Sequence, residues 1–165
     1  MKFPKRSLIS KYKNINISSN SDYSHKSQYK PTGLWFSYYS AWYNFIISNE
    51  LYDWLHKYIH SINIKSGYLT NIHNKSKSKL LVIKNNNEFD IFHKRYKVKT
   101  NEDLIDWNIV SNDYGGIEIS NLVTRNNIDW YYTWDIPSGC IWNYKLIKNI
   151  KLVYVKGKNN KYNKE

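Results

Sequence analysis

The apolar residues of this chain fall into short runs whose period changes repeatedly along the sequence. Leu34 to Tyr38 and Leu80 to Lys84 are runs of strand length, whereas Phe89, Phe92 and Tyr96 recur at the three- and four-residue spacing of a helix. Helical and strand segments do not alternate regularly, as they do in chains of βαβ units. The pattern therefore predicts an α+β fold with small mixed or antiparallel sheets and two to four helices.

The same periodicities predict the other elements. A stripe that starts at Trp42 and resumes after Asn49 predicts a helix, or two short ones, that extends through Ile59 with Ser40 as its N-cap. The remaining expectations are a first strand at 7–10, a long loop at 18–30, a strand at 68–73, a helix from a capping box at Thr100 and Asp103 through Val110, and strands at 130–134, 139–143 and 148–155.

Length and composition indicate one folded domain. The chain has 165 residues, of which 41% are hydrophobic and 17% aromatic, too many for a disordered chain. We predict a single domain over residues 1–155 and a polar basic tail over 156–165. Seven Trp and sixteen Tyr must supply much of the core, and their N–H and O–H groups need buried hydrogen-bond partners.

No run approaches the roughly 18 apolar residues of a membrane span. The first six residues are basic but are not followed by the apolar segment of a signal peptide, and the single Cys140 excludes an intrachain disulfide. These features predict a protein that is not secreted and not bound to a membrane, in the cytoplasm or an intracellular viral compartment.

The net charge of +12 resides in the ends of the chain. Residues 1–30 carry seven Lys or Arg against one acid, and residues 145–165 again carry seven against one. One interpretation is that these basic termini bind nucleic acid. The other is codon bias, because 22 Lys and 22 Asn with only 3 Arg are typical of an A/T-rich genome. Both interpretations stay open at this point.

Two potential reactive groups lack a supporting pattern. His56 and His60 have the spacing that puts two imidazoles on one helix face, but no Glu follows His56 and no third ligand is suitably spaced. Cys140 stands among large apolar residues, where a free cysteine is usually a small buried hydrophobe. We therefore predict no metal site and no cysteine nucleophile.

The two most unusual segments, 30–37 and 130–142, each combine a turn with clustered aromatic and hydroxyl residues. Flat rings for stacking and a few polar groups are what a cleft for a ring-shaped ligand requires. Two core strands beside turns would give the same composition, and Asp135 would then simply close the turn that follows it.

Gly33-Leu34-Trp35-Phe36-Ser37, followed by Ser40 and Tyr43 at the start of an apolar helix, resembles the second motif of ADP-ribosyltransferases. In that family a strand of this pattern leads into a helix, and its aromatic ring stacks on the nicotinamide of NAD. The resemblance implies that Trp35 stacks on the cofactor, that Ser37 and Tyr43 line the same pocket, and that Gly33 allows close approach.

The family's other motifs have looser counterparts. Its first strand offers His or Arg to the cofactor, for which Arg6 and His25 are the candidates here. Its third motif supplies a carboxylate that stabilises an oxocarbenium-like transition state, and the resemblance assigns this catalytic role to Glu118 or Asp135. It implies an enzyme that transfers ADP-ribose from NAD to an unknown acceptor.

Two other functions are compatible with the sequence. Basic residues interleaved with aromatic ones are typical of nucleic-acid-binding modules, although no RNP, KH or zinc-finger motif is present. A structural or scaffold protein of a virus without any site is the third possibility. The segments 30–37 and 134–139 also resemble those of small phage and giant-virus proteins, a similarity that implies no function.

Overall fold

The computed structural model describes residues 1–17, 24–125, 127–158 and 161–165. The strands are β1 (Arg6–Ser10), β2 (Leu34–Tyr38), β3 (Tyr58–Ile64), β4 (Leu69–Thr70), β5 (Ser76–Ile83), β6 (Lys97–Val98), β7 (Asn101–Ile105), β8 (Tyr114–Ile119), β9 (Ser138–Ile141), β10 (Ile147–Lys156) and β11 (Tyr162–Lys164). The helices are α1 (Ala41–Ser48), α2 (Asn86–Tyr96), α3 (Trp107–Asp113) and α4 (Asp129–Tyr132), with 3-10 turns η1 (Tyr52–Trp54) and η2 (Tyr144–Leu146).

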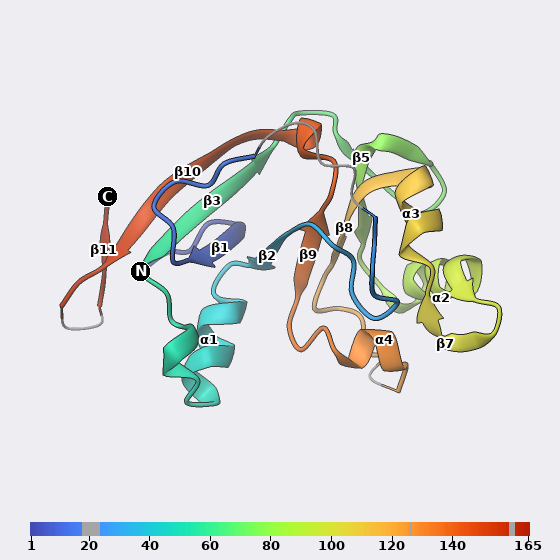
Figure 1. Ribbon diagram of the computed structural model, residues 1–165, viewed down its shortest axis with the longest axis horizontal. Coiled ribbons are helices and arrows are strands. Elements are labelled where there is room, and N and C mark those ends of the chain that lie inside the picture. Colours follow the sequence, from blue (N-terminus) through green and yellow to red (C-terminus); the bar gives the residue numbers. More distant parts are fainter. Residues whose placement is uncertain (18–23, 126, 159–160) are drawn as a thin grey trace.

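A bent, mixed sheet organises the fold (Figure 1). Its strand order is β11-β10-β3-β1-β2-β9-β8-β5-β4, and β6 and β7 form a separate antiparallel pair. Pairing is antiparallel from β11 to β8 and parallel between β8, β5 and β4. The α+β class predicted from the sequence is confirmed.

The helices pack on one face of this sheet in two separate groups (Figure 1). Residues that pair across strands share a face, so Ile9, Ile59 and Cys140 mark the side on which helices lie. There α1 covers β1 and β3 through a core that includes Ile46 and Ile59. The helices α2, α3 and α4 cover β5, β8 and β9 through a core rich in Trp. We call this side the helical face.

Three indole N–H groups in the aromatic core of the second group donate hydrogen bonds to acceptors of the protein. Trp142 Nε1 donates to the Tyr114 carbonyl at 2.7 Å, and Trp130 Nε1 donates to His93 Nδ1 at 3.1 Å. Trp107 Nε1 donates to the Gln28 carbonyl at 3.2 Å. The predicted lacing of the core by hydrogen bonds is confirmed, and these bonds fix the loop before β2 against α3.

The predicted helix through Ile59 is wrong in its second half. The helix α1 ends at Ser48, η1 is a single turn, and Tyr58 already lies in β3. Residues 58–64 pair with β1 on one side and β10 on the other, and the adjacent Ile59 and His60 are both buried, one on each face of the sheet. His60 lies on this strand and His56 before it, so the two imidazoles do not share a helix face. Ser40 is the N-cap of α1, but its side chain makes no capping hydrogen bond.

Two further segments differ from their predictions. Residues 101–105 form strand β7 instead of a helix, and the helix begins at Trp107, where Asp106 accepts capping hydrogen bonds from Asn108 and Ile109. The strand predicted at 130–134 is instead helix α4 and a turn. Its four-residue spacing brings Trp130 and Trp134 within 5.9 Å on one side, which a strand cannot do.

Two predicted segments include residues outside the described ones. The loop predicted at 18–30 includes 18–23, and the tail predicted at 156–165 includes 159–160. The described end of the tail returns to the sheet as β11, which pairs with β10. Among the described residues no helix is long and apolar enough to span a bilayer.

Candidate functional site

A cleft of about 390 Å³ lies between the two helical groups. Trp42 of α1 stands on one side, and Trp134 to Ile136, between α4 and β9, stand on the other. Figure 1 shows α1 and α4 on either side of β2, whose strand passes between the two groups. The cleft therefore occupies the strip of the helical face that neither group of helices covers.

Trp35, Ser37 and Ser7 form the floor of the cleft. Trp35 and Ser37 are two residues apart on β2 and thus point to the same face, and Ser7 of β1 pairs with Ser37. The two hydroxyls lie 3.1 Å apart, and Ser7 Oγ donates to the Tyr39 carbonyl at 2.5 Å. The spare acceptor lone pairs of these hydroxyls are what the floor offers a ligand.

The Trp35 ring is half-buried and held at its edges. Its Nε1 donates to the Pro31 carbonyl at 3.3 Å, and the Trp134 ring meets it edge-on at a centroid distance of 4.9 Å. Lys30 Nζ lies 5.7 Å from the centre of the Trp35 ring. The cleft thus combines a fixed indole with a cation on a long, flexible side chain.

Asp135 and Trp134 form the rim opposite α1. Asp135 is exposed and has a φ of +43°, a left-handed conformation that places its carboxylate beside the cleft. Trp134 is 3% exposed, and its Nε1 has no hydrogen-bond partner among the described residues. A buried N–H without an acceptor costs about 1–3 kcal/mol, which the packing of this indole against Trp35 and Trp107 must offset.

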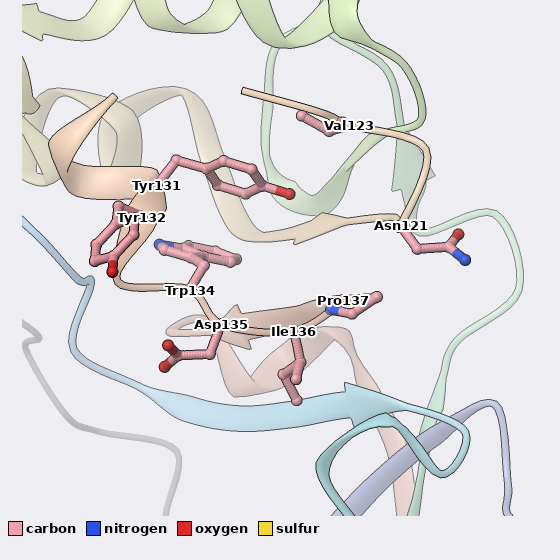
Figure 2. A pocket seen from close by; sticks show the side chains of 8 residues that line it. All are labelled: Asn121, Val123, Tyr131, Tyr132, Trp134, Asp135, Ile136 and Pro137. Atoms are coloured by element: carbon pink, nitrogen blue, oxygen red, sulfur yellow. The ribbon is translucent and has the colours of Figure 1, made fainter. Parts of the chain in front are cut away.

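A second hollow of about 370 Å³ adjoins the cleft across Trp134, Asp135 and Ile136 (Figure 2). Figure 2 shows Asn121 and Val123 on one side of this hollow and the segment from Tyr131 to Pro137 on the other. The Trp134–Ile136 segment is therefore a wall between two neighbouring hollows. A ligand longer than one ring system can extend from one hollow to the other over this wall.

Of the residues predicted to bind a cofactor, Gly33 and Tyr43 do not line the cleft. A Cβ atom on Gly33 would approach the Ile141 carbonyl and lie 2.8 Å from Cys140 Sγ, so this glycine permits the pairing of β2 with β9. Tyr43 faces the sheet, where its ring packs on Phe3 at 5.3 Å. Trp42, its neighbour on α1, is the residue that reaches the cleft.

Glu118 is on the face opposite to Trp35 and Asp135. Glu118 of β8 pairs with Gly139 of β9, which in turn pairs with Phe36 of β2, so Glu118 shares a face with Phe36 and not with Trp35. Its side chain is 0% exposed. Arg6 donates two hydrogen bonds to its carboxylate, at 2.6 and 2.9 Å. The structure thus joins Trp35, Ser37 and Asp135 in one cleft and places Glu118 in a buried ion pair elsewhere.

The Arg6–Glu118 pair joins β1 to β8 across two intervening strands. The Arg6 guanidinium lies 5.9 Å above the Phe36 ring, and a Cβ atom on Gly139 would lie 2.5 Å from Phe36 Cζ and 2.9 Å from Glu118 Cβ. Glycine at position 139 therefore makes room for the pair. Burial, then the charge of Glu118, raises the pKa of Tyr38 well above its ordinary range, so this phenol stays neutral.

His25 supports the turn that carries Lys30. Its Nδ1 accepts a hydrogen bond from the Thr32 backbone N–H at 3.0 Å, and its ring meets Trp142 edge-on at 5.1 Å. Burial lowers the pKa of His25 below its ordinary value of 6.5, although the charge of Asp106 opposes the shift. A neutral imidazole is what this contact requires, since Nδ1 must accept.

No family model, curated protein or solved structure matches this chain. The site must therefore be interpreted from its own geometry. Among the described residues there is no cluster of three or more His, Cys, Asp or Glu side chains that could hold a metal ion. Cys140 is fully buried, and burial raises the pKa of its thiol.

Sequence reasoning missed Lys30, Trp42 and Ser7 as cleft residues. Lys30 immediately precedes the Pro31–Gly33 turn, so its position next to the stacking candidate was visible in the sequence. The sequence assigns Trp42 to the apolar stripe of a helix. That periodicity does not tell which residue of the stripe faces the cleft and which ones face the core. Ser7 becomes a neighbour of Ser37 only through strand pairing.

Proposed function

We propose that the cleft between α1 and the Trp134–Ile136 segment binds NAD and that the protein is an ADP-ribosyltransferase-like enzyme. The observation that carries the proposal is that Trp35, Ser37 and Asp135, which lie up to 100 residues apart in the sequence, line one cleft. The family resemblance assigns these three residues to cofactor binding and charge stabilisation.

The residues of the cleft fit the chemical groups of NAD. Trp35 offers a ring on which the nicotinamide stacks, with Lys30 near that ring as the cation for the pyrophosphate. The Ser7 and Ser37 hydroxyls on the floor of the cleft are the hydrogen-bonding groups for the carboxamide. The hollow of Figure 2, with Tyr131 and Tyr132, adjoins the cleft on the side where the rest of a dinucleotide can extend.

Asp135 is the carboxylate at the cleft that we assign to catalysis. When NAD is bound, the bond between ribose and nicotinamide breaks, nicotinamide leaves with the bonding electrons, and the acceptor's nucleophile forms the new bond to the ribose carbon. A carboxylate beside that carbon stabilises the positive charge that develops there. Glu118 is neutralised by Arg6 on the opposite face, so we assign this role to Asp135 alone.

Release of nicotinamide from NAD tests the proposal, with water acting as acceptor where the natural one is absent. Asp135→Asn should lower the rate by about 100-fold, because a group placed at developing charge is typically worth that much. Asn tolerates the left-handed conformation at this position, so the variant should fold. Asp103→Asn is the matched control, since Asp103 of β7 is exposed and lines neither hollow.

The outcomes separate binding from catalysis. Loss of nicotinamide release in Asp135→Asn but not in Asp103→Asn, with NAD still bound, supports the assignment of Asp135. Equal rates in both variants would contradict it. If the unaltered protein neither binds nor cleaves millimolar NAD, the proposed function itself is wrong.

A further inference from the structure

The two basic ends of the chain come together in one part of the sheet. The strand β1 pairs with β3, β3 with β10, and β10 with β11, so segments from both termini lie side by side. Figure 1 shows both chain ends on this side of the molecule, away from α2, α3 and α4. We define the basic arm as residues 1–17, 56–66, 145–158 and 161–165.

The basic arm holds the whole net positive charge of the protein. It has 14 lysine and arginine residues and a single acid, Glu165, whereas the rest of the chain has 11 basic and 12 acidic residues. Codon bias enriches lysine along the whole chain and does not explain its segregation from acids in three segments far apart in sequence. Strand pairing brings the two basic ends of the chain together and adds the 56–66 segment between them.

Lysine and tyrosine side chains alternate at one end of this arm. Lys11 Nζ lies 5.1 Å from the centre of the Tyr12 ring, and Lys57 Nζ lies 5.5 Å from that of Tyr58. These pairs are neighbours, because Tyr58 pairs with Ser10 across β1 and β3. Tyr12 is 60% exposed, so its ring is accessible for stacking.

Two backbone contacts add more lysines to this end. The Lys13 carbonyl lies 2.9 Å from His60 Nε2, which holds the 11–17 segment against β3. The Lys156 backbone N–H donates to the Lys57 carbonyl at 2.8 Å, which places the turn carrying the exposed Lys158 beside Lys57. Lys11, Lys13 and Lys57 are exposed, and none is within 4 Å of a carboxylate among the described residues.

We propose that this end of the basic arm, formed by Lys11, Tyr12, Lys13, Lys57, Tyr58 and Lys158, binds single-stranded nucleic acid. Lysines that have no carboxylate partner attract phosphates, and an exposed tyrosine ring among them stacks on a base. A duplex hides the faces of its bases, and a lipid headgroup has none, so the tyrosines favour a single strand. The interface is separate from the cleft and does not depend on NAD binding.

Binding of a fluorescent thymidine oligonucleotide, measured by anisotropy over a series of salt concentrations, tests the lysines. The triple variant Lys11→Ala, Lys13→Ala, Lys57→Ala should weaken binding and reduce the slope of log affinity against log salt by about 2, at about 0.7 per lost phosphate contact. The control triple, Lys84→Ala, Lys94→Ala, Lys99→Ala, removes the same charge from exposed positions outside the arm and should keep the slope.

Tyr12 tests the stacking separately from the charge. Tyr12→Ala should weaken binding by about fivefold or more, and Tyr12→Phe, which keeps the ring, by less than about twofold. Equal losses in the two lysine triples would overturn the proposal, as would unchanged binding in Tyr12→Ala. Tighter binding to duplex or to phosphatidylserine vesicles than to the oligonucleotide would overturn it as well and would indicate a different polyanion.

Discussion

The basic arm and the rest of the molecule are built by different means. The arm is made of paired strands that pack against Ile46 of α1 through a small core with Ile9 and Ile59, and its surface is lysine-rich. The remainder is balanced in charge and is held by an aromatic core in which Trp107 and Trp130 are almost fully buried. Positive charge and aromatic content, which indicated competing functions in the sequence, therefore belong to different regions.

The cleft lies where these two regions meet. Ser7 comes from the arm, Trp134 and Asp135 come from the aromatic region, and β2 with Trp35 lies between them. A ligand in the cleft would contact both regions, whereas nucleic acid bound to the arm would contact one. The two proposed activities are therefore separable by substitution.

The largest effect is expected from breaking the ion pair that joins the two regions. Glu118→Gln leaves the buried Arg6 charge unpaired and should lower the free energy of unfolding by about 3–5 kcal/mol. That is a large part of the 5–15 kcal/mol typical of a domain, about 10 on average. Urea denaturation followed by circular dichroism measures it.

Two control variants test whether the loss of stability comes from this buried ion pair or from any change of charge. Asp90→Asn breaks an exposed ion pair with Arg125 and should leave stability nearly unchanged. The double variant Arg6→Met, Glu118→Leu removes both charges and should be more stable than Glu118→Gln. A single variant as stable as the wild type would contradict the structural role assigned to this pair.

A smaller contrast is expected from removing one tyrosine hydroxyl in each region. Tyr96 donates to the Asp113 carboxylate at 2.7 Å, and Tyr154 of the arm donates to the Lys2 carbonyl at 2.9 Å. Tyr96→Phe should cost about 1.5–3 kcal/mol and Tyr154→Phe about 1 kcal/mol, because a hydrogen bond to a charged group is stronger. The same urea series measures both, and the reverse order would contradict the assignment.

The smallest expected effect is a loss of stability at acidic pH. Burial lowers the pKa values of His25 and His93, both outside the arm, below 6.5. The unfolded chain then binds more protons than the folded one, so stability should fall as the pH drops through about 6.5. His25→Asn should reduce the difference in unfolding free energy between about pH 7.5 and about pH 5.5.

Local sequence patterns predicted the positions of many strands but not which residues share a face of the sheet. Leu34–Tyr38 was predicted to its exact bounds, because a Pro-Thr-Gly turn precedes an apolar run. Trp130–Trp134 was predicted as a strand, since bulky aromatic residues favour strands locally, yet tertiary packing of Trp130 on Phe89 and Trp107 selects a helical turn.

The sequence predicts those residues of the candidate site that lie within one local segment. Trp35 and Ser37 follow from one strand, and Asp135 from one turn. Whether Glu118 joins them depends on the register of β8 and β9 with β2, which no local pattern contains. A shift of one residue would have turned Glu118 to the helical face.

Calorimetric titration of the intact protein with NAD is the most direct test of NAD binding in the cleft. We expect saturable heat from one site that is lost in Trp35→Ala and preserved in Tyr12→Ala. The lysine triple variant of the arm should bind NAD as the wild type does. Absence of heat at millimolar NAD, or heat that Trp35→Ala leaves unchanged, would contradict the assignment of this cleft.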